Sequence, residues 1–523
     1  FGGSVSALRL AEKGYRVAVL EQGREHSVAD LRRAGQSMRH LLWAPALGLR
    51  GPLAQKVYRN VGVVHGVGVG GGSLVYAAVL LEPQAAFYRD PAWAALDDWQ
   101  ASLAAHYQRA RQMLGVADNP YQGQQDHWLQ RTATALGVAQ SYAPVPQGIY
   151  FGPPQALPDP YFAGRGPQRS GCNRCGSCIS GCPQGAKNSL DLNYLYLARQ
   201  LGVQVFSETR VSHISRQGAG YRVHLRGRTH ALRSLDAPQV ILAAGVLGSL
   251  EILFASRDRY RTLPHLPAAL GEHVRTNSEA IVAIRGQPGV DISQGTTISS
   301  HFHADAQTHI TQNRFPRSYN FMRLYMGPLV DDTRPLRRAA KVVGALLRRP
   351  RHWLGHWFTA DWYRRISVLT VMQQADNQLA FGYRRRAWRL GGFCLGVTPV
   401  GRRRLAYLPV TGQPGGACLC RGQWRRGTEC PAGKPGQSRG DGASAGRRGD
   451  RRFACGRCGG CAAPGLRSPG PVCDRRQQHP GQRRRQPEPD HRRRSRAGDQ
   501  PVAGAAGRLM RLSPRRGLPS WCA

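Results

Sequence analysis

The chain has 523 residues, of which 73 are Lys or Arg and 31 are Asp or Glu, so its formal net charge is +42. With 41% hydrophobic residues, it is long enough to form two or more domains with a sizeable core. No apolar run reaches the roughly 18 residues that a membrane-spanning helix needs, and the chain opens without Met or a signal peptide. We expect a cytoplasmic protein or one bound peripherally to a membrane, and we expect that N-terminal sequence is missing, so the presence of a signal is left open.

The N-terminal residues predict the second half of a nucleotide-binding βαβ unit. Residues 4–14 have helical spacing, and residues 16–21 form an apolar strand that ends at Glu21. Gly2 and Gly3 fit the last positions of the motif G-x-G-x-x-G, in which glycines let the backbone approach a pyrophosphate and a later acid binds the ribose hydroxyls. An ordinary helix followed by a strand is the alternative.

A second glycine-rich tract spans residues 62–82. Its centre consists of Gly70, Gly71, Gly72 and Ser73, which would present unhindered backbone donors ahead of an apolar strand. Such a loop lets a flat or anionic ligand approach closely. The alternative is a flexible turn.

A third element, residues 240–253, predicts a buried strand, a glycine turn at Ala244 and Gly245, and the start of a helix that faces the same ligand. Residues 91–115 and 187–201 have helical spacing of their apolar positions.

Residues 336–362 are rich in Arg, Trp and Leu. They predict either an amphipathic helix that lies on an anionic membrane or the solvated face and lid of a second domain.

Four of the thirteen cysteines, Cys172, Cys175, Cys178 and Cys182, follow the spacing C-x2-C-x2-C-x3-C, and a proline comes next. This is the spacing of bacterial ferredoxins, in which thiolates bind an iron-sulfur cluster. A single 4Fe-4S cluster held by all four is one interpretation. A structural zinc site, two local disulfides and metal-free thiols are the alternatives.

Residues 411–523 differ in composition from the rest of the chain. Arg, Gly and Pro make up 56 of these 113 residues, and Ile and Tyr are absent. Because so little apolar surface could be buried, we expect this tail to be disordered. Its net charge of +17 would suggest nucleic acid. However, it has few aromatic residues to stack on bases and no recognisable reading motif, so we expect no nucleic-acid partner.

In this order, the segments resemble the glucose-methanol-choline (GMC) family of flavoprotein oxidoreductases, closest to its cholesterol-oxidase-like branch. The resemblance rests on residues 1–21, residues 70–73, residues 243–245, residues 185–195 and residues 275–279. It implies an α/β fold in which a doubly wound, Rossmann-like FAD-binding domain is combined with an α+β substrate-binding domain.

The family resemblance also implies a division of the chain. The FAD-binding domain would comprise residues 1–90 and 166–280, the second part carrying the cysteines. Residues 91–165 would be a helical insertion on the substrate side, residues 281–410 the substrate-binding domain, and residues 411–523 the tail.

By resemblance, the chemistry would be hydride transfer from the CH-OH group of a hydrophobic alcohol, such as a sterol, to FAD. The resemblance places Gly3 at the pyrophosphate, Glu21 at the adenosine ribose, residues 70–73 beside the isoalloxazine, and Val211 at the adenine. Oxygen or an external acceptor would take the electrons. Tyr76 stands where many members have Asn, which puts one flavin contact in doubt.

The family's catalytic base is a His, assisted by a His or Asn near the C-terminal end, and neither motif occurs in residues 411–523. A one-base shift of the reading frame near residues 405–415 would explain this absence. In the advanced frame, residues 443–451 and 471–491 permit strings that resemble the family's His and Asn segments. The chain as printed would then lack its base and be inactive. An iron-sulfur electron-transfer protein with a vestigial flavin fold is the alternative function.

Overall fold

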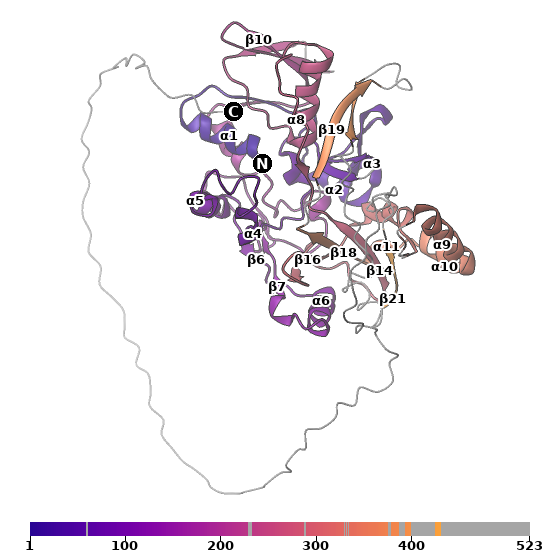
Figure 1. Cartoon of the computed structure of the whole chain (residues 1–523). Coiled ribbons are helices and arrows are strands. Elements are labelled where there is room, and N and C mark those ends of the chain that lie inside the picture. Colours follow the sequence, from indigo (N-terminus) through magenta and orange to yellow (C-terminus); the bar gives the residue numbers. More distant parts are fainter. Residues whose placement is uncertain are drawn as a thin grey trace, which may run out of the picture. The chain divides into compact units, whose positions relative to one another are not determined.

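The computed structural model describes residues 1–58, 61–227, 233–286, 289–328, 330, 332, 334–374, 378–385, 393–398 and 424–429 (Figure 1). Every described residue lies within the range Phe1–Asp441.

The N-terminal helix and strand form as predicted. Helix α1 (Gly2–Glu12) precedes strand β1 (Ala18–Leu20), which pairs in parallel with β9 (Gln204–Phe206). Helix α7 (Tyr194–Gln200) packs on α1 through a cluster that includes Leu8, Leu190, Leu195 and Ala198. Apolar residues of α1 and β1 therefore anchor the two glycines that begin the helix.

The second glycine tract differs from its prediction. Strands β4 (Leu53–Val57) and β5 (Gly62–Gly66) form an antiparallel pair, and the glycines then enter the 3-10 helix η2 (Gly71–Leu74). The apolar strand expected after the loop is absent, and only an isolated bridge joins Val79 to Gln147. Ala78, whose φ is 66°, interrupts the extended conformation that a strand requires.

The third element is also only partly as predicted. Helix α8 (Gly245–Phe254) begins at the expected glycine and continues as the π-helix η5 (Ala255–Arg259). Residues 240–243 are not a strand, and Ile241 is 56% exposed. A run of apolar residues becomes a strand only where a neighbouring strand takes up its backbone hydrogen bonds, and none of the described residues does so here.

A seven-stranded sheet is the largest element of the fold. Its strands, in spatial order, are β17 (Gly327–Pro328), β21 (Trp424–Glu429), β14 (Ala280–Gly286), β18 (Ile366–Gln373), β16 (Thr308–Asn313), β15 (Ser300–His303) and β7 (Ala143–Pro144). All neighbouring pairs are antiparallel. Helix α6 (Gln124–Ala135) covers one face, where Trp128 and Leu129 pack with Phe302, Ile310 and Leu369.

A buried ion pair fixes α6 to this sheet. Arg314 Nη2 lies 2.7 Å from Asp126 Oδ2, and both side chains are at most 3% exposed. Asp126 also accepts hydrogen bonds from Gly123 N and from the Ser299 and Ser300 hydroxyls. Burial alone would raise the pKa of Asp126, but Arg314 and these hydrogen bonds lower it overall.

Two three-stranded sheets are also present. One contains β10 (Thr209–Gln217), β11 (Gly220–Gly227) and β12 (Ser234–Ala237), and the other contains β13 (Val274–Arg275), β19 (Gln378–Arg385) and β20 (Phe393–Thr398).

Helices also form in two other regions that the sequence singled out. Helix α5 (Trp99–Met113) lies in the first predicted helical region. Helices α9 (Pro335–Arg348), α10 (Pro350–Trp357) and α11 (Trp362–Arg365) cover the Arg-, Trp- and Leu-rich stretch. The remaining helices and short strands are α2 (Val28–Gln36), α3 (Met38–Leu41), α4 (Ala85–Tyr88), η1 (Pro45–Leu47), η3 (Ala139–Ser141), η4 (Cys178–Ser180), η6 (Arg317–Leu324), β2 (Trp43–Ala44), β3 (Leu49–Arg50), β6 (Ala117–Asp118) and β8 (Pro146–Gln147).

The fold is thus mixed α/β, and the described part shows one parallel strand pair of the expected doubly wound domain. The prediction of a disordered tail is wrong at Trp424–Glu429, because β21 pairs with β14 and β17. This pairing satisfies backbone groups along an edge of β14 that would otherwise be open. The rest of the tail, including the proposed His and Asn segments, lies outside the described residues. The division into five segments stays a prediction.

Candidate active site

The predicted phosphate-binding glycines meet the third element at the start of two helices. A Cβ atom on Gly3 would lie 2.8 Å from the Ala243 side chain, so the beginnings of α1 and of α8 are close together. Ala244 is the N-cap of α8, and Gly245 follows with a φ of 67°. The N-terminus of a helix carries a partial positive charge and free amides, and two of them in one place suit an anionic group.

Glu21 lies between the βαβ unit and the glycine tract. Its Oε1 accepts hydrogen bonds from Gly23 N at 2.8 Å and from Gly68 N at 3.1 Å. Burial raises the pKa of Glu21, although the two backbone hydrogen bonds act in the opposite direction. The structure therefore places Glu21, the residue predicted to bind the ribose, directly beside the glycine tract.

The glycine tract is compact because its backbone segments touch. A Cβ atom on Gly66 would lie 2.3 Å from the Gly71 carbonyl oxygen, and Gly68, Gly70 and Gly71 have φ values of 141°, 106° and 57°. These positions require glycine. At Gly71 and Gly72 a Cβ atom would meet open space, so this side of the loop leaves room for a ligand.

Ser73 anchors the loop. Its hydroxyl donates to the Gly70 carbonyl at 2.6 Å and accepts from Leu190 N at 2.9 Å. The amides of Gly71 and Ser73 bind carbonyls within the loop. What the loop offers a ligand is therefore the open backbone surface at Gly71 and Gly72, and Ser73 holds that surface in place.

Val211 lies on β10, opposite Leu225 and next to a bulge in the strand pair. The strand begins beside Glu21, because Thr209 N donates to the Glu21 carbonyl at 2.8 Å. Val211, the residue predicted to contact adenine, is thus two residues after Thr209, whose amide binds the main chain of Glu21.

Sequence reasoning did not single out Lys187, which joins the loop to the cysteine cluster. Its buried Nζ donates to the carbonyls of Leu74, Tyr76 and Cys178 at 2.9, 3.1 and 2.7 Å. Burial lowers the pKa of Lys187 to about 8. The only signal was its position in residues 185–195, a run typical of the family.

Two further side chains, Tyr76 after the loop and Asp191 in the same run as Lys187, lie beside the loop. Tyr76 donates to the Asn188 carbonyl at 2.9 Å, and burial raises its pKa. Asp191 Oδ1 is buried without a hydrogen-bond partner among the described residues and lies 3.0 Å from the position of a Cβ atom on Gly70. Burial raises the pKa of Asp191 as well. An unpartnered polar atom at this place fits a loop that receives a polar ligand.

The four predicted metal ligands line one pocket together with Lys187. All four cysteines are free thiols, so the alternative of two local disulfides does not agree with the structure. Burial raises the pKa of Cys172 to about 12 and that of Cys178 to about 11, and the neighbouring thiols act in the same direction. A metal bound in this pocket would therefore have to deprotonate Cys172 and Cys178.

The open backbone at Gly71 and Gly72, the paired helix N-termini, and the position of Glu21 and Asp191 fit a dinucleotide such as FAD.

Comparison with known proteins agrees with this geometry. The profile of the GMC oxidoreductase family matches residues 166–257. A cholesterol oxidase of Mycobacterium tuberculosis is 39% identical over 397 residues, which cover 72% of this chain and 68% of that protein. A cholesterol oxidase of Acinetobacter baumannii is 34% identical over 432 residues, 78% of this chain and 76% of the relative. An uncharacterised GMC-type oxidoreductase of M. tuberculosis is 30% identical over 253 residues, 47% of this chain and 36% of the relative. The chain therefore belongs to the GMC oxidoreductase family, in its cholesterol-oxidase-like branch, and is an FAD-dependent alcohol oxidoreductase.

Proposed function

We propose that the protein oxidises the secondary alcohol of a sterol. The observation that carries this proposal is the similarity to cholesterol oxidases over more than two thirds of the chain. A hydrophobic alcohol also suits the large antiparallel sheet that the family resemblance assigns to the substrate.

In this function, bound FAD supplies the acceptor for the hydride. Glu21 would hold the ribose hydroxyls, and the N-termini of α1 and α8 would neutralise the pyrophosphate charge. Lys187 fixes the loop through the Leu74 and Tyr76 carbonyls, so that the open side of Gly71 and Gly72 keeps its shape. Preorganisation of this kind lowers the cost of bringing an alcohol carbon to its acceptor.

The base that would take the hydroxyl proton belongs to the C-terminal segment that the predicted frame shift affects. We propose that a frame restored after about residue 410 supplies the family's His and Asn, and that the chain as printed binds the cofactor but oxidises alcohol poorly. Verified DNA whose codons cannot encode those segments in the advanced frame would contradict this proposal.

We further propose that the cysteine pocket holds a single 4Fe-4S cluster. The ferredoxin spacing supports this assignment, as does the convergence of all four thiols in one pocket. Lys187 hydrogen-bonds to the Cys178 carbonyl and to the Leu74 carbonyl at the end of the glycine loop, so the pocket and the loop are close together. The pocket would then give the electrons of the alcohol a route to an external acceptor, which favours a dehydrogenase over an oxygen-using oxidase. Iron analysis and paramagnetic resonance of the dithionite-reduced protein test this, and bound zinc or metal-free thiols would contradict it.

Helices α9 and α10 support a proposal of peripheral membrane association. The two helices contact each other (Figure 1). Leu336, Leu347 and Phe358 are between 74% and 87% exposed. Leu336, Val343 and Leu347 recur at helical spacing, and Arg337, Lys341 and Arg348 lie on the adjoining side of α9. An apolar stripe with basic neighbours suits an anionic membrane surface, where a lipid-like substrate resides. No helix in the described part of the chain is long and apolar enough to cross a membrane.

The test of the sterol proposal is an anaerobic titration of the FAD-loaded protein, with the frame as printed and with the frame restored. Oxidised flavin absorbs at about 450 nm and loses this band on reduction. We expect cholesterol to bleach the frame-restored protein, and cholestane, which lacks the hydroxyl, to leave the band unchanged. A frame-restored protein that binds FAD but is not bleached by cholesterol would contradict the proposal. Bleaching by dithionite alone would favour the electron-transfer alternative.

A further inference from the structure

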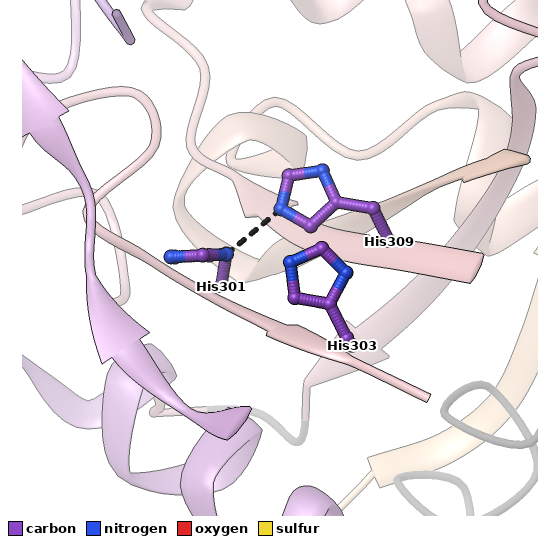
Figure 2. A group of neighbouring side chains, drawn as sticks. All are labelled: His301, His303 and His309. Atoms are coloured by element: carbon purple, nitrogen blue, oxygen red, sulfur yellow. Dashed lines mark hydrogen bonds between the residues drawn. The ribbon is translucent and has the colours of Figure 1, made fainter. Parts of the chain in front are cut away.

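Three histidines gather on one face of the hairpin formed by β15 and β16. The register pairs His303 with His309 and His301 with Thr311. Alternate residues of a strand share a face, and directly paired residues of two strands also share it. His301, His303 and His309 therefore point to the same side, as Figure 2 shows.

The three imidazoles are close enough to share one ion. Each offers a ring nitrogen, and these three atoms all lie within 4.8 Å of one another. His309 Nε2 and His301 Nδ1 are 2.9 Å apart, and the rings of His303 and His309 stack with centroids 4.8 Å apart. Nitrogens around a tetrahedral zinc ion are roughly 3.4 Å apart, given Zn–N bonds of about 2.0–2.1 Å. Side-chain rotations that move the ring nitrogens by roughly 1–2 Å would bring the three histidines to that geometry.

The backbone beneath the trio is held firmly. The opposite face of the hairpin carries Phe302 and Ile310, which are fully buried against α6. The Ser141 hydroxyl accepts from His303 N and donates to the His303 carbonyl. A rigid hairpin keeps the ligands together before a metal arrives, and this lowers the entropic cost of binding.

The surroundings also suit a cation. A neutral imidazole has a lone pair on one ring nitrogen that it can share with a cation, and the three rings face one another here. The Asp305 carboxylate acts electrostatically on His303. The Gln84 amide lies 3.2 Å from His303 Nε2 and brings the segment before α4 to the edge of the group.

From this geometry we propose that His301, His303 and His309 form a site for one divalent transition-metal ion of the zinc class, with water completing the coordination. Imidazole is a preferred ligand of Zn2+, and three nitrogen ligands plus water is a common coordination set. The bound ion would clamp the hairpin and the segment at Gln84 together. This site is separate from the cysteine pocket and does not depend on the sterol proposal.

The test must separate these histidines from the cysteines, which also bind zinc. The full chain is equilibrated with Zn2+ and passed through a desalting column, and its metal content is measured for the wild type, for His309→Ala, and for His106→Ala, which removes an exposed histidine of α5. We expect one ion fewer per chain in His309→Ala than in the other two, and zinc affinity at this site weakened by at least about 100-fold.

A second readout identifies the ligands. Co2+ bound to thiolates shows an intense near-ultraviolet charge-transfer band, whereas Co2+ bound to nitrogen and oxygen ligands lacks it. The difference spectrum between wild type and His309→Ala should therefore contain visible d–d bands without the thiolate band. Circular dichroism of the metal-free variants checks that they fold. Equal zinc content in a folded His301→Ala/His309→Ala double variant and the wild type would overturn the proposal.

Discussion

The glycine loop around residues 66–73 and the seven-stranded sheet hold functional groups in opposite ways. In the loop, the backbone forms the binding surface, and side chains such as Ser73 and Lys187 hold it in position. In the sheet, the backbone is the support, and side chains such as His301 form the candidate site. A glycine that lets the backbone approach a ligand can be recognised directly in the sequence. A site made of side chains depends on strand register, which the sequence does not state. The first kind of site was therefore predicted and the second was not.

The largest effect is expected where the sheet depends on buried charge. Arg314→Met leaves the Asp126 carboxylate buried without its cation, which should lower the free energy of unfolding by about 3–5 kcal/mol. Arg222→Met breaks the exposed pair with Asp236 and should change stability little. Urea denaturation of both variants checks this, and equal losses would show that the sheet does not depend on its buried pair.

The next effect is a pH dependence on the loop side. The unfolded chain keeps the Lys187 proton up to the ordinary pKa of 10.5, whereas the folded chain releases it at about 8. Folding is therefore favoured progressively as the pH rises between these values, by up to about 3 kcal/mol from this group alone. Lys187→Met should lack this contribution.

The measurement is the difference in free energy of unfolding between wild type and Lys187→Met at several pH values from 7.5 to 10.5. We expect this difference to grow in favour of the wild type as the pH rises. Lys13→Met, which removes an exposed lysine, controls for the loss of a surface charge. Parallel curves for wild type and Lys187→Met would mean that Lys187 titrates alike in both states.

A smaller change separates ligand binding from folding. Gly72→Val places a side chain in open space beside the loop, so the fold should persist while FAD affinity falls by at least about 30-fold, or about 2 kcal/mol. Gly344→Val makes the same change on α9, also into open space, and should leave FAD affinity unchanged. Flavin fluorescence quenching gives both affinities. Unaltered binding by Gly72→Val would remove the loop from the cofactor site.

The smallest effect concerns the surface of α9. Leu347→Glu should weaken binding to anionic phospholipid vesicles by about 10-fold, because an apolar contact is lost and a negative charge is added. Leu96 is as exposed as Leu347, at 74%, so Leu96→Glu is a matched control that should bind like the wild type. Vesicle co-sedimentation measures both, and equal losses would show that α9 is not the contact surface.

Local patterns predicted part of the fold well. The helical and strand spacing around Glu21 and the glycines at residues 70–72 predicted α1, β1 and a tight loop, because each feature depends on neighbours in the sequence. The strands expected after Leu74 and at residues 240–243 did not form. An apolar run forms a strand only where another segment, elsewhere in the chain, pairs with it or covers it.

Long-range contacts account for what sequence reasoning missed. Asp126 and Arg314 are 188 residues apart, and Lys187 reaches carbonyls more than 110 residues earlier. His301, His303 and His309 lie near one another in sequence, but their common face follows from the register of β15 and β16. Each residue alone is an ordinary polar side chain, and only the fold shows what it contacts.

The most direct test of the central claim is equilibrium dialysis of the purified full chain against FAD. Glu21, the open glycine loop and the paired helix N-termini predict one FAD per chain, retained after dialysis and lost in Gly72→Val but not in Gly344→Val. A folded chain that retains no FAD, or that binds it equally well in both variants, would contradict the assignment of this loop as the cofactor site.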